Sequence, residues 1–346
     1  MLYRGVDIPG MAQRKKVRIA INGFGRIGRA AFRIALTKKD IDIVAINDLT
    51  DAKTLAHLLK YDSVFRTFDR DVSATKTSLR VDRKQFPIYA KADPSKLPWR
   101  RLKVDVVLEC TGRFTKNDEA KIHLKAGAKR VIVSAPVEGG TTPTLLLGVN
   151  EKSYAKGTTM ISNASCTTNC IAPVAAIMSE KFGIRKAMMT TIHSYTMDQR
   201  LHDAPHSDLR RARAAAQNII PTTTGAATAT AQVIPKLKGL FDGLSLRVPT
   251  INVSLSDFTF LVKRKTDIKE VNRVLVLASK SPRYKGILGV TDEPLVSSDF
   301  IGDPRSSIVD LSLTNVVDGD MVKVIAWYDN EWGYSNRLIE LIRLVR

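Results

Sequence analysis

The stretch VRIAINGFGRIGR, residues 17–29, decides the fold of this chain. Its first six residues form an apolar run that predicts a buried β-strand. Glycines follow in the spacing G-x-G-x-x-G, at Gly23, Gly25 and Gly28, and the helical pattern of Ile27–Leu36 comes directly after them. In a strand–turn–helix unit, the first glycine permits a tight turn, the second lets the backbone approach a pyrophosphate, and the third allows close helix–strand packing. The stretch therefore predicts a dinucleotide-binding unit.

An acidic residue stands at the distance that this motif requires. Asp48 follows a second predicted strand, Ile41–Ile46, and lies 20 residues beyond Gly28. A carboxylate there can accept hydrogen bonds from both ribose hydroxyls of NAD and would repel the extra 2′-phosphate of NADP. The alternative is that Asp48 caps the next predicted helix, Ala52–Tyr61, because aspartate is common at helix starts. The glycine motif upstream favours the ribose role.

The rest of the chain divides into two parts with different patterns. As far as residue 149, strands alternate with helices, which predicts a doubly wound, Rossmann-type parallel sheet. From residue 166 on, strands are grouped apart from helices, which predicts an α+β domain with a largely antiparallel sheet. Further strands are predicted at Val104–Glu109, Arg130–Val133, Leu145–Val149, Ile184–His193, Val253–Lys263, Ile308–Leu313 and Val322–Tyr328, and further helices at Thr115–Ala126, Cys166–Phe182, Asp267–Ser279 and Asn336–Arg346.

The composition is that of an ordinary globular protein. Its 346 residues exceed one typical core and indicate two domains. No apolar run approaches the roughly 18 to 20 residues that span a bilayer, and Met1–Arg14 lacks the continuous hydrophobic segment of a secretory signal. Three cysteines are too few for a disulfide framework, and no histidine cluster accompanies them to hold zinc. We therefore expect a cytoplasmic protein without a metal site.

The net charge is unusual. Lysine and arginine number 54 against 34 acidic residues, which leaves +20. Such a surface can bind nucleic acid, and it can also steer anionic substrates into a cleft. The basic residues are scattered in short groups, with no long basic run, so an enzyme for anionic ligands is the favoured interpretation. Nucleic-acid binding as the primary function is the alternative.

The segment SNASCTTNC, residues 162–170, contains the candidate nucleophile. Cys166 falls where a predicted helix begins, and a thiolate there would have its pKa lowered by the positive end of the helix. Cys110, at the end of a predicted strand, is interpreted as a buried small residue, and Cys170, one turn further along the helix, as an inert neighbour. Cys166 alone has the polar setting of a reactive thiol.

A nucleophilic cysteine usually needs a base. His193 stands at the end of a predicted strand, where residues of active sites tend to project. There it could form an ion pair with Cys166 and take up a hydroxyl proton when a hydride leaves. His57 and His123 lie in helical patterns and are interpreted as surface or packing residues. Spacing alone leaves the pairing of Cys166 with His193 open.

Taken together, four motifs resemble those of phosphorylating glyceraldehyde-3-phosphate dehydrogenase. They are INGFGRIGR at 21–29, SNASCTTNC at 162–170, DLRRARAA at 208–215 and WYDNEWGYS at 327–335. The resemblance runs from about Lys16 to Arg346 and implies oxidative phosphorylation of glyceraldehyde 3-phosphate, with NAD and inorganic phosphate as the other reactants. It implies that Cys166 forms a hemithioacetal and then a thioester, and that His193 is the acid–base group.

The resemblance also assigns binding roles. Thr196 and Arg247 would hold the substrate phosphate, which suits the forked bonds of arginine. The attacking phosphate would contact Ser165, Thr167, Thr224 and Gly225, with Arg211 nearby. NAD would contact Arg26, Ile27, Asp48, Thr111, Ser134 and Asn330, in addition to the glycine motif.

The same resemblance implies the domain organisation and the assembly. The NAD-binding domain would be discontinuous, comprising residues 1–165 and 330–346, because the C-terminal helix packs back onto it. Residues 166–329 would form the catalytic domain. The chain would assemble as a homotetramer, in which the loop Tyr195–Arg213 reaches the cofactor site of a neighbouring subunit.

Some positions depart from the common pattern of this family. Met197 replaces an asparagine, Ala92 stands where a basic residue often approaches the adenine, and Ala204 takes the place of a leucine common in NAD-specific members. An alanine at this last position is familiar in members that accept NADP, whereas Asp48 favours NAD. We therefore predict NAD preference with some use of NADP.

A close relative offers a second enzymatic interpretation. Erythrose-4-phosphate dehydrogenase shares the cysteine chemistry but transfers the acyl group to water. The segment Arg247–Val253 suits either enzyme, whereas Thr222–Gly225 fits an inorganic phosphate site and favours the phosphorylating one.

Overall fold

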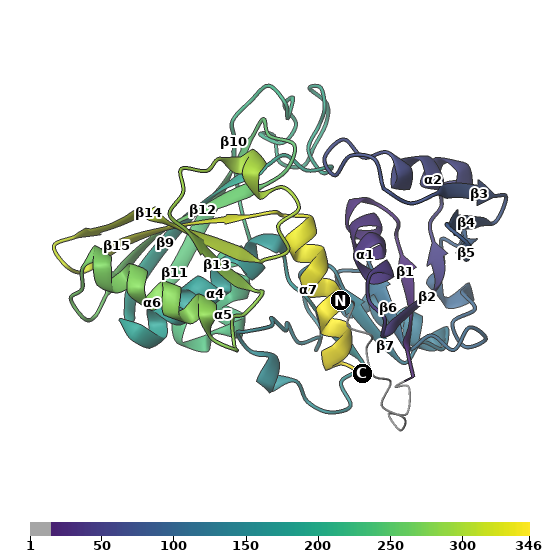
Figure 1. The fold of residues 1–346 in the computed structure, drawn as a ribbon, viewed down its shortest axis with the longest axis horizontal. Helices are drawn as coiled ribbons and strands as arrows, with labels where there is room; N and C mark the ends of the chain where they lie inside the picture. Colours follow the sequence, from purple (N-terminus) through teal and green to yellow (C-terminus); the bar gives the residue numbers. More distant parts are fainter. Residues whose placement is uncertain (1–14) are drawn as a thin grey trace, which may run out of the picture.

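Two β-sheets, one of eight strands and one of seven, form the framework of this computed structural model (Figure 1). The structure describes residues 15–346, so the interpretation of Met1–Arg14 concerns residues outside this range. No helix in the described part of the chain combines the length and the apolar character that a membrane crossing requires.

The first sheet has β1 (Val17–Asn22) and β2 (Ile41–Asn47) at its centre, in the order β3-β4-β5-β2-β1-β6-β7-β8. The six strands from β5 to β8 in this order run parallel, while β3, β4 and β5 form an antiparallel meander at one edge. This meander was not predicted from the sequence. The other strands are β3 (Val72–Thr75), β4 (Ser78–Val81), β5 (Lys84–Tyr89), β6 (Val106–Glu109), β7 (Arg130–Val133) and β8 (Met160–Ser162).

Both faces of this sheet are covered. Ile19 and Ile21 of β1 belong to a core that includes side chains of α1 (Arg26–Leu36), α2 (Ala52–Lys60) and α7 (Trp332–Leu344). Ala20, between them, points to the opposite face and packs with Trp99 and with Ala126, which follows α3 (Ile122–Lys125). The predicted doubly wound parallel sheet is confirmed.

The second sheet has the order β10-β11-β9-β12-β15-β14-β13, and only the β11–β9 and β13–β14 pairs are parallel. One face packs against α4 (Cys166–Lys181), α5 (Ala226–Val233) and α6 (Ile268–Lys280). The prediction of a largely antiparallel sheet is therefore confirmed. Its strands are β9 (Ile184–Ser194), β10 (Ile220–Thr222), β11 (Phe241–Val248), β12 (Ser254–Val262), β13 (Leu288–Thr291), β14 (Ser307–Val317) and β15 (Met321–Tyr328).

Three predicted elements differ from the structure. The helix expected at Thr115–Ala126 is helical only from Glu119, because Asn117 and Asp118 take left-handed backbone angles with φ of 46° and 60°. The segment Leu145–Val149 forms hydrogen-bonded turns instead of a strand, and β8 takes the sheet edge next to β7. The last helix begins at Trp332, earlier than the predicted Asn336.

The final helix returns the chain from the second sheet to the first (Figure 1). It follows β15, and Leu338, Leu341 and Ile342 of α7 are fully buried in the same core as β1. The residues that connect β15 to α7 therefore lie at the crossing point between the two sheets.

Candidate active site

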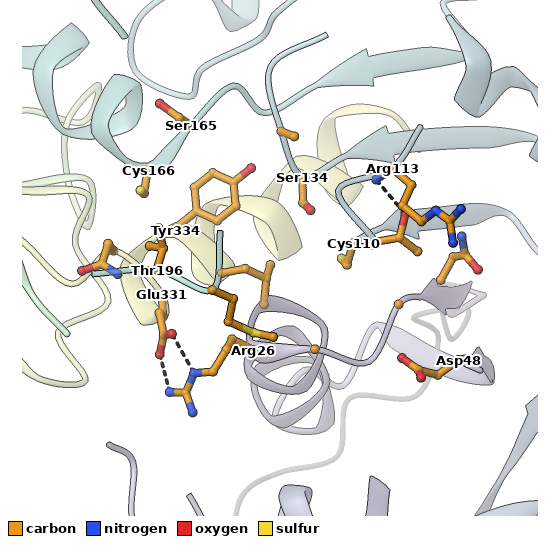
Figure 2. A pocket seen from close by; sticks show the side chains of 18 of the residues that line it. Arg26, Asp48, Cys110, Arg113, Ser134, Ser165, Cys166, Thr196, Glu331 and Tyr334 are labelled. Carbon is orange, nitrogen blue, oxygen red and sulfur yellow. Dashed lines mark hydrogen bonds and ion pairs between the residues drawn. The ribbon is translucent and has the colours of Figure 1, made fainter. Parts of the chain in front are cut away.

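A cavity of about 920 Å³ is lined by residues from both halves of the chain, a size within the range of small-molecule and cofactor sites. It lies at the carboxyl ends of the parallel strands, where ligands bind in open α/β sheets. Cys166 and Thr196 stand at one end of the pocket and Asp48 at the other (Figure 2). Of the predicted site residues, the pocket wall includes Gly23, Gly25, Arg26, Ile27, Asp48, Thr111, Ser134, Ser165, Cys166, His193, Thr196 and Asn330.

The three glycines of the motif do different work. A Cβ on Gly28 would lie 2.1 Å from the carbonyl oxygen of Gly23, and Gly23 itself has a φ of 90°. These two glycines are therefore required by the turn and by packing. Gly25, by contrast, has no atom within 4 Å of an added Cβ, although it lines the pocket. Space held open at the uncapped start of α1 fits a pyrophosphate, which needs close backbone approach and free N–H donors.

Asp48 is tied to the glycine turn. Its Oδ2 accepts a hydrogen bond of 2.7 Å from the backbone N–H of Phe24, and its Oδ1 accepts one of 2.9 Å from Thr50 N–H. The cap of α2 is Asp51, whose side chain accepts from the N–H of Thr54 at 3.0 Å. The helix-capping alternative for Asp48 is therefore wrong, and its carboxylate lies on the pocket wall.

A buried carboxylate that sequence reasoning missed holds Thr111 in place. Glu109 accepts hydrogen bonds from the N–H of Thr111 at 2.8 Å, from the Thr111 hydroxyl at 2.5 Å and from Asn22 Nδ2 at 2.5 Å. Trp99 Nε1 donates to His123 Nδ1 at 3.0 Å, so the ring proton of His123 is on Nε2, which donates to Glu109 at 2.8 Å. Both His123 and Glu109 are fully buried. His123 is thus a packing residue, as predicted.

Asn330 is oriented by two hydroxyl groups. Its Oδ1 accepts hydrogen bonds of 3.0 Å from Ser194 Oγ and 3.0 Å from Ser254 Oγ. With Oδ1 facing both hydroxyls, Nδ2 is left for other partners. The Nδ2 amino group of Asn330 is then a donor at the pocket wall, which fits the carbonyl oxygen of a nicotinamide carboxamide.

Cys166 and His193 lie close together at the reactive end of the pocket. The Cys166 Sγ is 3.5 Å from His193 Nε2. Cys166 is the first residue of α4, and Ser165 caps this helix by accepting from the N–H of Thr168 at 3.0 Å. His193 Nδ1 is 2.6 Å from the carbonyl oxygen of Ser194, so Nδ1 carries the proton and Nε2 faces the thiol as an acceptor.

Burial opposes the lowering of the thiol pKa that is expected at the helix start. It raises the pKa of the Cys166 thiol, although the positive charge of Arg247 opposes this rise. Burial, together with the charge of Arg247, lowers the pKa of His193 to about 3. Burial thus disfavours the charged form of both groups, while Arg247 favours the thiolate.

The other two cysteines are less reactive. Cys170 is buried, as predicted, and burial raises its pKa to about 12. Cys110 was expected to be buried but is partly exposed on the pocket wall (Figure 2). Its pKa is nevertheless raised to about 12 by desolvation and by the charge of Glu109.

A chain of polar contacts extends from His193 to Arg211. Arg247 Nη1 donates to Thr196 Oγ1 at 2.9 Å and lies 3.2 Å from His193 Nδ1. The Thr196 hydroxyl donates to Asp198, which pairs with Arg211 at 2.6 Å. The two arginines predicted for separate phosphates are therefore linked through Asp198. Asp198 was not predicted from the sequence, because it is one of three aspartates in this loop and its spacing does not single it out.

Burial alone would raise the pKa of Asp198, but the hydrogen bond from Thr196 and the two arginines hold it below its usual value. The carboxylate is therefore ionised at neutral pH. It occupies hydrogen-bond donors that an incoming phosphate would otherwise use.

Five of the predicted phosphate contacts lie off the pocket wall: Thr167, Arg211, Thr224, Gly225 and Arg247. Thr167 is buried, and its hydroxyl is 2.9 Å from the hydroxyl of Tyr328. Thr224 Oγ1 accepts from the N–H of Ala226 at 3.2 Å, and Gly225 is the N-cap residue of α5. Arg211 Nη2 reaches the neighbouring carbonyl oxygen of Thr223 at 3.3 Å. Thr224 and Gly225 are thus brought near Arg211, as predicted, while Thr167 faces Tyr328.

The fold and the pocket agree with comparisons to known proteins. Residues 17–117 match the family model described as glyceraldehyde 3-phosphate dehydrogenase, NAD binding domain, and residues 165–330 match that family's C-terminal domain. A dinucleotide cradle that shares one pocket with a thiol and an imidazole defines the class: the protein is an NAD-dependent oxidoreductase.

Relatives along nearly the whole chain narrow this class. A glyceraldehyde-3-phosphate dehydrogenase of Geobacillus stearothermophilus is 54% identical over 326 residues, which cover 94% of this chain and 97% of that protein. The enzyme of the same name from Thermotoga maritima is 56% identical over 330 residues, 95% of this chain and 98% of that protein. The chain belongs to the glyceraldehyde-3-phosphate dehydrogenase family.

The different roles of the glycines give a first prediction. Gly25→Ala should leave the thermal unfolding midpoint within about 2 °C of the unchanged protein, because an added methyl meets no protein atom, yet it should weaken NAD binding roughly tenfold or more by blocking backbone approach. Gly28→Ala should instead lower the midpoint, because its methyl clashes with Gly23. Calorimetric NAD titration and thermal unfolding measure both effects. Unchanged NAD affinity in Gly25→Ala would contradict the cradle.

The charge state of the thiol gives a second prediction. In the cofactor-free protein, alkylation of Cys166 by iodoacetamide should speed up with rising pH and show no inflection below pH 8, because burial raises the thiol pKa. Arg247→Gln should slow alkylation roughly threefold to tenfold at fixed pH, since it removes the cation that favours the thiolate. Mass spectrometry should find Cys110 and Cys170 unmodified. An inflection near pH 6 would mean that the pair is ionic.

Proposed function

We propose that this protein oxidises and phosphorylates glyceraldehyde 3-phosphate to 1,3-bisphosphoglycerate, with NAD and inorganic phosphate as co-reactants. The observation that carries this proposal is the 3.5 Å approach of Cys166 Sγ to His193 Nε2 within a dinucleotide pocket. Arg247 and Arg211 lie near this pair and can bind anions. They support a reaction in which the substrate carries a phosphate group and the acyl acceptor is inorganic phosphate.

In the first step, the Cys166 sulfur attacks the aldehyde carbon. The thiol proton moves to His193 Nε2, which is the free acceptor of that ring, and from there to the aldehyde oxygen, so a hemithioacetal forms. The sulfur becomes nucleophilic as its proton leaves. Burial lowers the pKa of His193, which leaves the Nε2 lone pair unprotonated but makes it a weaker base.

In the second step, the hemithioacetal is oxidised to a thioester on Cys166. Bound NAD supplies the hydride acceptor, and Asn330 would hold its carboxamide through the Nδ2 group. His193 takes the hydroxyl proton as the hydride leaves. Inorganic phosphate then attacks the thioester carbon, the C–S bond breaks, and the proton held by His193 returns to the sulfur. The energy of aldehyde oxidation is kept in the acyl phosphate.

Arg247 links substrate binding to this proton transfer. Its guanidinium lies between Thr196 Oγ1 and His193 Nδ1, and its charge contributes to the low pKa of His193. A substrate phosphate held by Arg247 and Thr196 offsets part of that charge. Binding of the correct substrate would therefore make His193 a stronger base at the moment when it is needed.

The remaining parts of the proposal concern cofactor choice and domains. NAD is the cofactor. Ala204 and Ala92 support some use of NADP, whereas Asp48 favours NAD. The NAD-binding domain would comprise residues 1–165 and 330–346, with 166–329 as the catalytic domain; the burial of α7 against β1 supports this division. A cytoplasmic location is proposed from the glycolytic role of the reaction.

The predicted assay separates this function from transfer of the acyl group to water. NADH formation from glyceraldehyde 3-phosphate should require added inorganic phosphate, and catalytic efficiency should be higher with NAD than with NADP. Cys166→Ala should abolish turnover, and His193→Asn should lower kcat by roughly 10² to 10⁴. Phosphate-independent turnover at the full rate would indicate erythrose-4-phosphate dehydrogenase chemistry, and a preference for NADP would contradict the role of Asp48.

We further propose that the chain assembles as a homotetramer. The face of the second sheet opposite α4, α5 and α6 carries apolar side chains that a single chain leaves exposed. Met188, Leu244 and Met321 are 59%, 42% and 47% exposed, whereas their neighbours Met189 and Val322 point to the helical face and are buried. A sheet face of this kind is typical of protein contact surfaces.

Sedimentation should therefore give the mass of four chains. The pair of changes Met188→Glu and Leu244→Glu should yield smaller species, because both carboxylates would be buried without partners. Leu277→Glu is the control, since Leu277 is an exposed apolar residue on α6, outside this face. A monomer in the unchanged protein, or dissociation caused by Leu277→Glu alone, would contradict the proposed contact.

A further inference from the structure

Arg26 lies beside the phosphate cradle, but its side chain binds two carboxylates. Its guanidinium forks onto Glu331, with Nε donating to Oε1 at 2.7 Å and Nη2 donating to Oε2 (Figure 2). The third nitrogen, Nη1, donates to Asp62 Oδ2 at 2.9 Å. Two carboxylates thus engage all three nitrogens of Arg26, so its guanidinium is not a free donor for a ligand in the cradle.

The side chains of this ion pair are mostly buried and lie beside aromatic rings. The side chains of Arg26, Glu331 and Asp62 are only 25%, 13% and 7% exposed. The Phe65 ring lies 5.6 Å from the guanidinium carbon and 5.1 Å from the ring of Trp332. Partly buried, forked ion pairs of this kind hold a defined geometry, which a solvent-exposed pair does not.

The two partners belong to different segments that line the cofactor pocket. Arg26 is the first residue of α1 and follows Gly25, where the pyrophosphate would bind. Glu331 precedes α7 and directly follows Asn330, which also lines the pocket. The ion pair therefore joins the glycine turn to the segment that carries Asn330, the residue that would hold the nicotinamide.

Asn330 and the start of α7 are each held by other contacts, so Glu331 is the residue that can set the distance between Asn330 and the glycine turn. Asp329 anchors the crossing point from β15 to α7 by accepting from the N–H groups of Glu331 at 2.9 Å and Trp332 at 2.7 Å. Ser194 and Ser254 fix the amide of Asn330 to the second sheet. The forked ion pair between Arg26 and Glu331 connects this anchored segment directly to the glycine turn.

We propose that Arg26 and Glu331 are a positioning pair that holds Asn330 at a set distance from the glycine turn and so couples the pyrophosphate end of the cofactor site to its nicotinamide end. The inference rests on the proposed use of NAD. A dinucleotide must engage both ends at once, so an error in their separation costs affinity even if each end is intact. An ion pair that only stabilised the fold would lower the unfolding midpoint without changing cofactor affinity.

The test is a double-mutant cycle on NAD affinity, measured by calorimetry with the full-length protein. Glu331→Gln keeps the shape of the side chain but removes the charge, and it should raise the Kd for NAD roughly fivefold to tenfold. Arg26→Gln should have a similar effect, and the double variant should be no weaker than either single one. In steady-state assays of Glu331→Gln, the KM for NAD should rise, whereas the KM for glyceraldehyde 3-phosphate should shift less than twofold.

A second ion pair on the same helix supplies the control. Arg343, near the other end of α7, pairs with Asp40 at 2.9 Å on an exposed surface. Arg343→Gln should leave the Kd for NAD unchanged within twofold. Equal loss of affinity in Arg343→Gln and Glu331→Gln, additive losses in the cycle, or unchanged affinity in a folded Glu331→Gln variant would each overturn the proposal. Because binding is measured without turnover, these outcomes are distinct from a failure of the proposed reaction.

Discussion

The hydrogen bond from His193 Nδ1 to the carbonyl oxygen of Ser194 is the contact on which the reactive end of this protein depends. It selects the tautomer in which Nε2 is an acceptor, and it aims that nitrogen at the sulfur of Cys166. Ser194 also donates through its hydroxyl to Asn330, so a single residue at the end of β9 orients both the base and the amide at the cofactor site. The groups for proton transfer and for hydride transfer are therefore both positioned by the end of β9.

Around this contact, positive charge is balanced locally. The chain carries a net charge of +20, yet two arginines of the site are already engaged by carboxylates: Arg26 by Glu331 and Asp62, and Arg211 by Asp198. An anionic ligand that used either arginine would have to compete with these carboxylates. Arg247 differs, because it donates to the neutral Thr196 hydroxyl and lies against a neutral imidazole. It is the cation with the most to gain from a substrate phosphate.

Much of the fold could be predicted from local patterns. The strand Val17–Asn22 agrees with its prediction residue for residue, because a short, mostly apolar run followed by glycines has few other interpretations. The meander at Val72–Tyr89 was missed, since its strands are only four to six residues long and carry little apolar periodicity. Leu145–Val149 was mistaken for a strand because apolar content does not distinguish a strand from a buried turn, and the side chain of Asn150 stabilises that turn.

By itself, the sequence determined the chemistry available to this protein: a glycine turn, Asp48, and a cysteine and a histidine in recognisable motifs. Only the tertiary structure decided their charge states, because burial and the guanidinium of Arg247 come from segments distant in the chain. It also decided the partners of Arg26, whose carboxylates lie 36 and 305 residues away. Electrostatic free energies depend on distance and desolvation in space, and neither quantity is written in local sequence.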